Sequence, residues 1–219
     1  MVNKYAYRKN KKEGFKLKKI KYIIFLILLM SIFLFVSATT YANTVSKDLS
    51  ENFFRLHIIA NSDSNEDQSL KLKVRDGIID YMKTLSYEGI NKDDAVILTK
   101  EHLEDFKNIA KQILEENNCN YDINLEIGNF YFPTKEYGNI SLPAGFYDGL
   151  KIEIGEAKGQ NWWCSLFPPL CFVDISSGII DESAENDLKE NLSDEEFAII
   201  TENSEEIKLK FKLLELLSN

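Results

Sequence analysis

Histidine is scarce in this chain of 219 residues, which contains only His57 and His102. The two histidines are too far apart in the sequence to form a metal-binding pair on one helix. The chain also lacks a glycine-rich phosphate loop and a serine at the centre of a nucleophile elbow. These absences weigh against a phosphate-transfer enzyme, a zinc enzyme and a serine hydrolase. We therefore expect no catalytic residues, no metal site, no cofactor and no small-molecule substrate.

Cysteine and proline are also rare, with three and four copies, yet the segment Asn161–Asp174 holds two of each together with both tryptophans. Cys164 and Cys171 have a spacing that can close a short disulfide loop if the chain folds back. Such a loop would contribute about 2.5 kcal/mol to stability through chain entropy. Alternatively, Cys164 is a nucleophile, but it would then need a nearby base, and neither histidine has a suitable spacing. Pro168 and Pro169 fix their own backbone φ angles and stiffen the loop.

The apolar run Tyr22–Val36 is preceded by nine lysines and arginines and one glutamate. Small residues follow the run, and Val36-Ser37-Ala38 or Thr40-Tyr41-Ala42 can each present a signal-peptidase site. Fifteen residues is short for a spanning helix, which needs about 20. We interpret residues 1–42 as a basic n-region followed by a hydrophobic signal peptide or an uncleaved N-terminal anchor, and the small residues favour cleavage. The segment contacts the membrane before cleavage, and the rest of the chain is exported.

Acidic residues dominate the exported part, where residues 43–219 carry 34 Asp and Glu against 17 Lys and Arg. This charge argues against nucleic acid, whose backbone needs clustered cations, and against docking onto anionic lipid. A protein ligand, a cation-binding module and an enzyme with a neutral or cationic substrate remain. Export favours a disulfide between Cys164 and Cys171, because both then lie outside the reducing cytoplasm. Cys119 is left over, and we interpret it as an ordinary small residue.

Hydrophobic periodicity predicts an α+β domain over residues 47–176, with a mostly antiparallel sheet and two long helices packed on one of its faces. The helices are expected at residues 65–85 and 92–117. Residues 133–145 are expected to form a turn-rich loop with a type I turn at Leu142–Gly145. An acidic linker, 177–192, and a C-terminal helical segment, 193–219, beginning with a capping box at Ser193, complete the chain. The expected strands are Phe53–Ala60, Tyr121–Phe132, Phe146–Ile154, Trp162–Leu166 and Leu170–Val173.

A polar segment, Asn61–Asp67, joins the first expected strand to the first helix. Ser64 followed by Asp67 resembles a capping box, and acidic residues suit the positive end of a helix dipole. The segment also alternates Asn and Asp as calcium ligands would. However, an EF-hand loop needs glycine at its sixth position and glutamate at its twelfth, where this chain has Glu66 and Leu72. Helix capping is therefore the preferred interpretation, and a cation-binding module is an alternative.

The chain contains three blocks of sequence and a weaker fourth block that occur in the order of one known family. The blocks are Arg55–Asp76, Gly128–Gly145 and Asn161–Phe172, and the weaker one is Phe211–Leu216. Together they resemble the stage II sporulation protein R family of endospore-forming bacteria. The resemblance covers about Phe53 to Asp174 and the C-terminal segment. The positions that carry the family motifs are Arg55, His57, Asn61, Ser62, Asp63, Asp67, Lys73, Arg75, Asp76, Pro133, Gly138, Pro143, Gly145, Pro168 and Pro169.

This resemblance implies a signalling protein and not an enzyme. Such proteins are made in the forespore and exported into the space between the forespore and mother-cell membranes. There they bind a membrane-embedded aspartic protease of the mother cell, which then processes the pro-form of sporulation sigma factor E.

The leading hypothesis is therefore a receptor ligand whose activity is binding. Interfaces favour aromatic residues at their energetic centres, although core packing is the alternative for the two tryptophans. A competing hypothesis is an exported cell-wall-active enzyme that uses His57, Asp63 and Asp67. The candidate partner contacts are Lys135, Tyr137, Trp162, Trp163 and Phe167.

Overall fold

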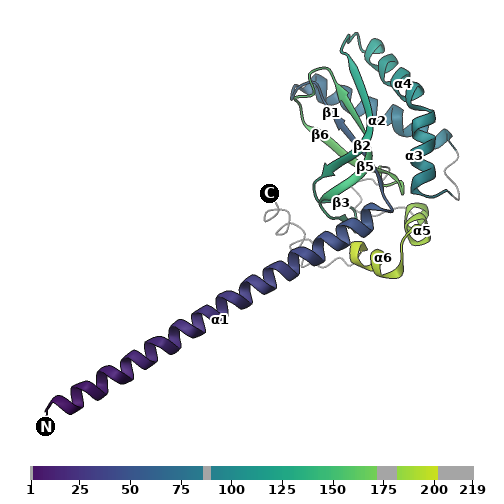
Figure 1. Ribbon diagram of the computed structural model, residues 1–219. Coiled ribbons are helices and arrows are strands. Elements are labelled where there is room, and N and C mark those ends of the chain that lie inside the picture. The colour runs from purple at the N-terminus through teal and green to yellow at the C-terminus, as the bar shows by residue number, and fades with distance from the viewer. Residues whose placement is uncertain (1, 86–89, 172–181, 202–219) are drawn as a thin grey trace. The chain divides into compact units, whose positions relative to one another are not determined.

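The computed structural model describes residues 2–85, 90–171 and 182–201 (Figure 1). The chain divides into two compact units, residues 1–43 and 44–219, and each is described by itself. Helix α1, Val2–Ser50, forms the first unit and ends within the second. Its stretch Lys18–Tyr41 has a mean hydropathy of 2.6 over its most apolar window and is long enough to cross a membrane. The apolar N-terminal segment expected from the sequence is thus helical, as a signal sequence or an anchor would be.

A four-stranded sheet of order β2-β5-β1-β6 is the centre of the second unit. Strand β1 pairs in parallel with β5 and antiparallel with β6, and β2 pairs antiparallel with β5. The sheet is therefore mixed and mostly antiparallel, and the predicted α+β class is confirmed. The strand bounds are β1 Phe54–Ile59, β2 Ile123–Phe132, β5 Gly145–Ile154 and β6 Asn161–Phe167.

Period-two alternation in β1 separates the two faces of this sheet. Leu56 and Ile58 point to the face that carries the main hydrophobic core and are fully buried. Helix α2, Asn65–Thr84, contacts β1, and helix α4, Leu103–Glu116, contacts both β2 and α2 (Figure 1). Val74 and Ile78 of α2 lose all their exposed surface to this core, which is the apolar stripe that the sequence predicted.

The second long helix of the prediction is two helices instead of one. Helix α3, Lys92–Glu101, ends at His102, where α4 begins. His102 has φ −101° and ψ 14°, and its Nδ1 lies 2.9 Å from the Tyr81 hydroxyl and 2.8 Å from Asp105 Oδ2. These side-chain contacts hold the break in place, and no glycine or proline in the local sequence announces it.

A hairpin occupies the segment, residues 133–145, that was expected to be a turn-rich loop. It consists of β3, Lys135–Tyr137, and β4, Ile140–Leu142, which pair antiparallel. The turn lies at Gly138, whose φ of 59° suits glycine, whereas Leu142–Gly145 only bends and leads into β5. Ile140 and Leu142 are fully buried, so the hairpin forms because both side chains enter the core. Three-residue strands are too short for their alternation to be recognised in sequence.

Strand β6 matches its prediction, but no strand follows Pro168 and Pro169 within the described residues. Leu170 donates its N–H to Ser165 O (3.1 Å) and Cys171 lies in the turn. The peptide bond before Pro168 is cis. The predicted disulfide between Cys164 and Cys171 is present, and Cys119 is free.

Part of the predicted acidic linker is helical. Helix α5, Glu182–Asn191, buries Leu188, and helix α6, Asp194–Thr201, begins at the predicted capping box, in which Ser193 and Glu196 bond each other. Residues 177–181 of the linker and 202–219 of the predicted C-terminal segment lie outside the described residues, as does the motif at Phe211–Leu216.

Replacing both Cys164 and Cys171 with serine should lower the free energy of unfolding by about 2.5 kcal/mol, because the unfolded chain regains the entropy of a closed loop. Urea denaturation followed by tryptophan fluorescence measures this loss. Cys119→Ser is the matched control and should change the free energy of unfolding by less than about 0.5 kcal/mol. A double variant as stable as the wild type would show that the disulfide contributes nothing to the fold.

Candidate interaction site

The sheet face opposite α2 carries polar and aromatic side chains, and we call it the His57 face. It is defined by His57 of β1, Lys151 of β5, Trp163 of β6, and Glu126 and Phe130 of β2. Register brings these residues together, because His57 is paired with Lys151 on one side and with Trp163 on the other. Lys151 is in turn paired with Glu126.

His57 is held on three sides and is only 7% exposed. Its ring stacks on Trp163 with centroids 3.6 Å apart and meets the edge of Phe132 at 6.1 Å. Its Nε2 lies 2.7 Å from Asn161 Oδ1. Burial lowers the pKa of His57 and outweighs the opposing effect of the bond to Asn161. His57 is therefore a neutral, fixed element of this face near neutral pH.

Lys151 lies at the centre of a charged row on the same face. Its Nζ is 2.8 Å from Glu126 and 3.3 Å from Glu153, and it sits 4.8 Å from the centre of the Phe130 ring. The bond to Glu126 raises the pKa of Lys151, with a further contribution from Glu153. The charges of the row are thus paired, and the half-buried Trp163 is its large aromatic neighbour.

Arg55 lies two residues before His57 on the same face and is completely buried. Its Nη2 donates to the Tyr137 hydroxyl (2.7 Å) and its Nε to Cys164 O (3.4 Å). The guanidinium lies 4.4 Å from the centre of the Phe132 ring and 5.0 Å from that of Tyr147. In the described part of the chain, its Nη1 has no hydrogen-bond partner. Aromatic faces therefore take the place of a carboxylate around this buried cation.

Tyr137 links this arginine to the β3–β4 hairpin. Its hydroxyl also donates to Trp163 O at 3.3 Å. Burial raises the pKa of Tyr137, against the opposing effect of Arg55, so the phenol stays protonated and remains a donor. The hairpin is thereby fastened to β1 and β6 through one side chain.

The Asn61–Asp67 segment forms a closed hydrogen-bond network at the start of α2. Asp67 Oδ2 accepts from Asn61 Nδ2 (2.8 Å) and Ser62 Oγ (2.6 Å), while Ser64 Oγ accepts from the Asp67 N–H (3.1 Å). Burial raises the pKa of Asp67, but the bonds from Ser62 and Asn61 outweigh this effect and hold it below its usual value. The predicted helix cap at Ser64 is confirmed, and the alternating side chains bond one another. Among the described residues, no cluster of three or more His, Cys, Asp or Glu is arranged to hold a metal ion.

The loop between β5 and β6 closes over this network. Asn61 Oδ1 accepts from the Glu156 N–H at 2.9 Å, and Lys71 Nζ donates to Gln160 O at 3.0 Å. A Cβ at Gly159 would lie 2.2 Å from Ser62 O, so only glycine permits this approach. The family-motif residues of this segment therefore join the end of β1, the start of α2 and the β5–β6 loop.

The residues of the cell-wall enzyme hypothesis do not form a coupled group. His57 contacts Asn161, Trp163 and Phe132. Asp67 bonds Asn61 and Ser62 at the other end of β1 from Arg55, and Asp63 is exposed. No described contact joins His57 to either carboxylate, so the structure shows no acid–base pair there.

The five predicted partner contacts fall into two groups. Tyr137 and Phe167 are 5% and 4% exposed, so they have almost no surface for a partner, and the prediction is corrected for them. Their aromatic character reflects core packing. Lys135, Trp162 and Trp163 are half-buried and keep some surface, so contact with a partner remains a prediction for these three.

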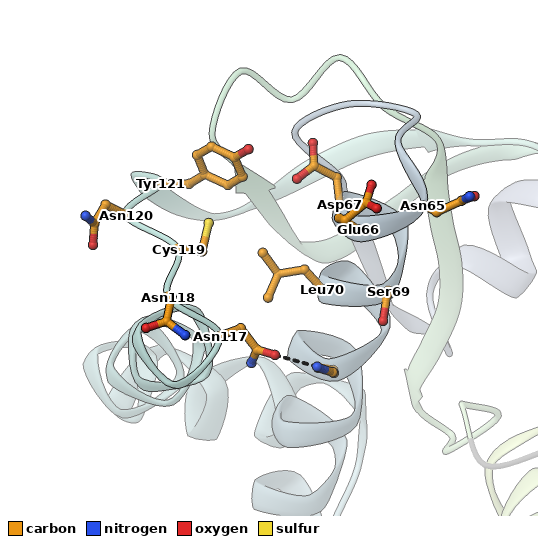
Figure 2. Close-up of a pocket in the computed structure, with 11 residues that line it drawn as sticks. Asn65, Glu66, Asp67, Ser69, Leu70, Asn117, Asn118, Cys119, Asn120 and Tyr121 are labelled. Atoms are coloured by element: carbon orange, nitrogen blue, oxygen red, sulfur yellow. Dashed lines mark hydrogen bonds between the residues drawn. The ribbon is translucent and has the colours of Figure 1, made fainter.

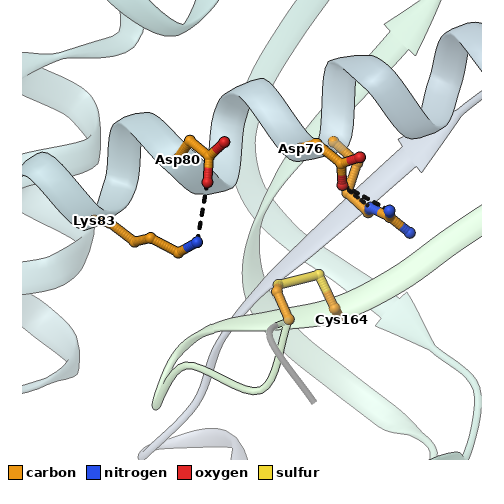
Figure 3. A network of polar contacts seen from close by, with 6 residues as sticks. Asp76, Asp80, Lys83 and Cys164 are labelled. Atoms are coloured by element: carbon orange, nitrogen blue, oxygen red, sulfur yellow. Dashed lines mark hydrogen bonds and ion pairs between the residues drawn. A yellow bond between two sulfur atoms is a disulfide. The ribbon is translucent and has the colours of Figure 1, made fainter. Parts of the chain in front are cut away.

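Other family-motif residues have structural roles. Arg75 lies 4.2 Å from the centre of the Trp162 ring and forms an ion pair with Asp76 at 2.6 Å. Figure 3 shows the pairs of Asp76 and Asp80 along α2 and the disulfide at Cys164. Lys73 donates to Asn117 and so ties α2 to the end of α4. Pro133 and Pro143 flank the hairpin, and Gly145 begins β5.

Sequence reasoning missed Asn161, Lys151 and Phe132 as neighbours of His57. The alternation of Arg55 and His57 with apolar residues was a signal that β1 has a second, polar face. Which residues join that face depends on strand order, which local pattern does not specify.

Replacing His57 with phenylalanine should weaken the dependence of stability on pH. Because the folded pKa lies below the ordinary value of 6.5, the unfolded chain binds the proton more readily. This contribution is fully present above the unfolded pKa and is lost as pH falls through the folded pKa. Urea denaturation at about pH 7.5 and about pH 5 measures the loss, which should be smaller in the variant. Equal losses in the two proteins would contradict the assignment.

Comparison with known proteins agrees with the sequence resemblance. The family model of stage II sporulation protein R matches residues 50–177. The curated stage II sporulation protein R of Bacillus subtilis (strain 168) is 36% identical over 155 residues, which cover 70% of this chain and 69% of that protein. No solved structure matches the chain. The chain belongs to the stage II sporulation protein R family, and its role is in sporulation.

Proposed function

We propose that this chain is an exported signalling protein that binds and activates a membrane-embedded aspartic protease. The activated protease then processes the pro-form of sporulation sigma factor E. The chain is made in the forespore and acts from the space between the forespore and mother-cell membranes. Family membership supports the role in sporulation, and the finer steps are what the family resemblance implies.

Export is supported by the N-terminal helix. Nine basic residues come before the apolar stretch or at its start, and the positive-inside rule keeps that end in the cytoplasm. The acidic domain then emerges on the other side of the membrane, whether the helix is cleaved as a signal or kept as an anchor. A disulfide between Cys164 and Cys171 suits that compartment, since such bonds persist outside the reducing cytoplasm.

The observation that carries a binding role is the fixed His57 face. Trp163 is stacked on His57, and Lys151 is held between two carboxylates. A partner that docks here meets side chains whose conformational entropy is already lost, which lowers the cost of association. Trp163 and Phe130 are aromatic residues of the kind that interface centres favour, and the paired charges around Lys151 suit the polar rim of an interface.

Co-expression in a non-sporulating host tests the proposed function. The full chain, the protease and the pro-sigma factor are produced together, and cleavage of the pro-sigma factor is followed by immunoblot. Cleavage is expected only when all three proteins are present. A chain that leaves the pro-sigma factor intact in this host, and whose deletion leaves processing normal in sporulating cells, is not the activating signal.

Trp163→Ala should lower the amount of processed sigma factor at least about tenfold in the same assay, because a central aromatic contact is worth about 1.4 kcal/mol or more. Ile97→Ala is the matched control, since Ile97 is an apolar side chain of α3 that is 54% exposed. The two variants must show the same protein level and the same denaturation midpoint. If they activate equally well, the partner does not use the His57 face.

A further inference from the structure

A pocket of about 670 Å³ lies between the first turns of α2 and the segment that joins α4 to β2 (Figure 2). It is separate from the His57 face, because it is formed beside the helices and not on the polar side of the sheet. Pockets for small organic groups commonly have volumes of a few hundred cubic ångströms or more. The volume therefore suits a ligand larger than an ion.

Most of the lining consists of neutral hydrogen-bonding side chains. These are Asn65, Ser69, Asn117, Asn118, Asn120 and Tyr121. Asn117 is already bonded, because its Oδ1 accepts from Lys73 and its Nδ2 donates to Ile113 O at 2.7 Å. Each of the other amides offers two donor hydrogens and an acceptor oxygen, and each hydroxyl is both donor and acceptor. Ligand groups that both donate and accept are the natural complement of such a lining.

The centre of the pocket combines an aromatic ring with a small apolar floor. Figure 2 shows the Tyr121 hydroxyl pointing across the pocket toward Asp67, with Leu70 and Cys119 turned into the space between them. Tyr121 is 38% exposed, so its ring is available to a ligand. An aromatic face of this kind packs against the C–H groups of a flat ligand.

Charge at the pocket excludes two other classes of ligand. Glu66 and Asp67 contribute two carboxylates, which repel phosphates and nucleotides. Lys73 is the positively charged side chain among the described lining residues, and it already donates to Asn117. A multivalent cation is disfavoured too, since Asp67 Oδ2 already accepts from Asn61 and Ser62.

We infer that this pocket binds a neutral saccharide, with Tyr121 stacked on a sugar ring and the surrounding amides bonded to its hydroxyl or acetamido groups. Vicinal hydroxyls supply paired donors and acceptors, which Asn65, Asn118 and Asn120 match, and they also donate to the exposed Glu66 carboxylate. An extended peptide fits less well, because it needs a strand edge or a row of alternating backbone partners.

Asp67 fixes the α2 side of the pocket through its own hydrogen bonds. Its Oδ2 accepts from Ser62 and Asn61, so the start of the helix is held against the end of β1. The Lys73–Asn117 bond fixes the distance between α2 and the opposite wall of the pocket. The framework of the pocket is thus formed before any ligand arrives, which lowers the cost of binding, although Figure 2 shows that the Asn65 and Asn120 amides point outward and must turn to reach a ligand.

A saccharide site gives the exported domain a second attachment besides its protein partner. Cell-wall glycan is a source of such sugars outside the cytoplasmic membrane. Binding there would hold the domain near its site of action without any chemical step. The inference does not depend on protease activation, so either can fail without the other.

Saturation-transfer NMR with the β-1,4-linked tetramer of N-acetylglucosamine tests the inference. The full chain is kept in a zwitterionic detergent that has no sugar headgroup. Transfer to the acetyl and ring protons of the tetramer is expected, and Tyr121→Ala should weaken the affinity about tenfold. Tyr131→Ala is the matched control, because Tyr131 is also 38% exposed but lies outside the pocket, and it should leave the affinity unchanged.

Four outcomes distinguish a sugar site from a peptide site and from nonspecific contact. Tetra-alanine is titrated under the same conditions as a peptide probe. Saturation transfer to the sugar that is lost in Tyr121→Ala and kept in Tyr131→Ala supports the inference. No transfer to the sugar, equal loss in both variants, or transfer to tetra-alanine alone overturns it. Ser69→Trp is a second variant that fills the pocket from an exposed position of α2, and it should also abolish transfer.

Discussion

The buried guanidinium of Arg55 is the interaction on which the second unit depends. Its charge is buried, and within residues 2–85, 90–171 and 182–201 no carboxylate pairs with it. Burial of an unpaired charge is costly. Phe132 and Tyr147 surround it with aromatic faces, while Cys164 O and the Tyr137 hydroxyl accept hydrogen bonds from it. These contacts come from four different elements besides β1, namely β2, β5, β6 and the β3–β4 hairpin. All of them must therefore be in place before the guanidinium has its contacts. One side chain makes the sheet and its hairpin interdependent.

Arg55 also connects the core to the surface that we propose for binding. Tyr137 bonds both Arg55 and the backbone of Trp163, and the disulfide begins at the residue that follows Trp163. The bond from Tyr137 and the neighbouring disulfide thus fix the backbone of Trp163, and with it the position of the His57 ring that stacks on its side chain. A surface held in this way presents its aromatic groups without rearrangement. A rigid docking surface suits the binding role that we propose, because little conformational entropy is lost on association.

Local pattern in the sequence predicted the elements that bury one face each. Apolar residues alternate in the strand near Ile123 and recur at helical spacing in the helix through Val74, and both elements were found where predicted. The helix cap at Ser64 was also found where predicted. The hairpin was missed because each of its strands has three residues. The break at His102 was missed because contacts from Tyr81 and Asp105 hold it. Of the site, Trp163 was predicted, but its neighbours Lys151 and Asn161 come from a strand order that no local rule contains.

The two proposed contact regions differ in how they are held. On the His57 face, side chains are fixed by ring stacking and paired charges across four strands. At the pocket, they are fixed by hydrogen bonds at the start of a helix. These two networks meet in the strand β1, since Arg55 and His57 lie within it and Asn61 follows it. A change in β1 would therefore weaken both regions together. A substitution at Trp163 acts on the His57 face alone, and one at Tyr121 acts on the pocket alone. These two substitutions therefore separate the contribution of each region to function.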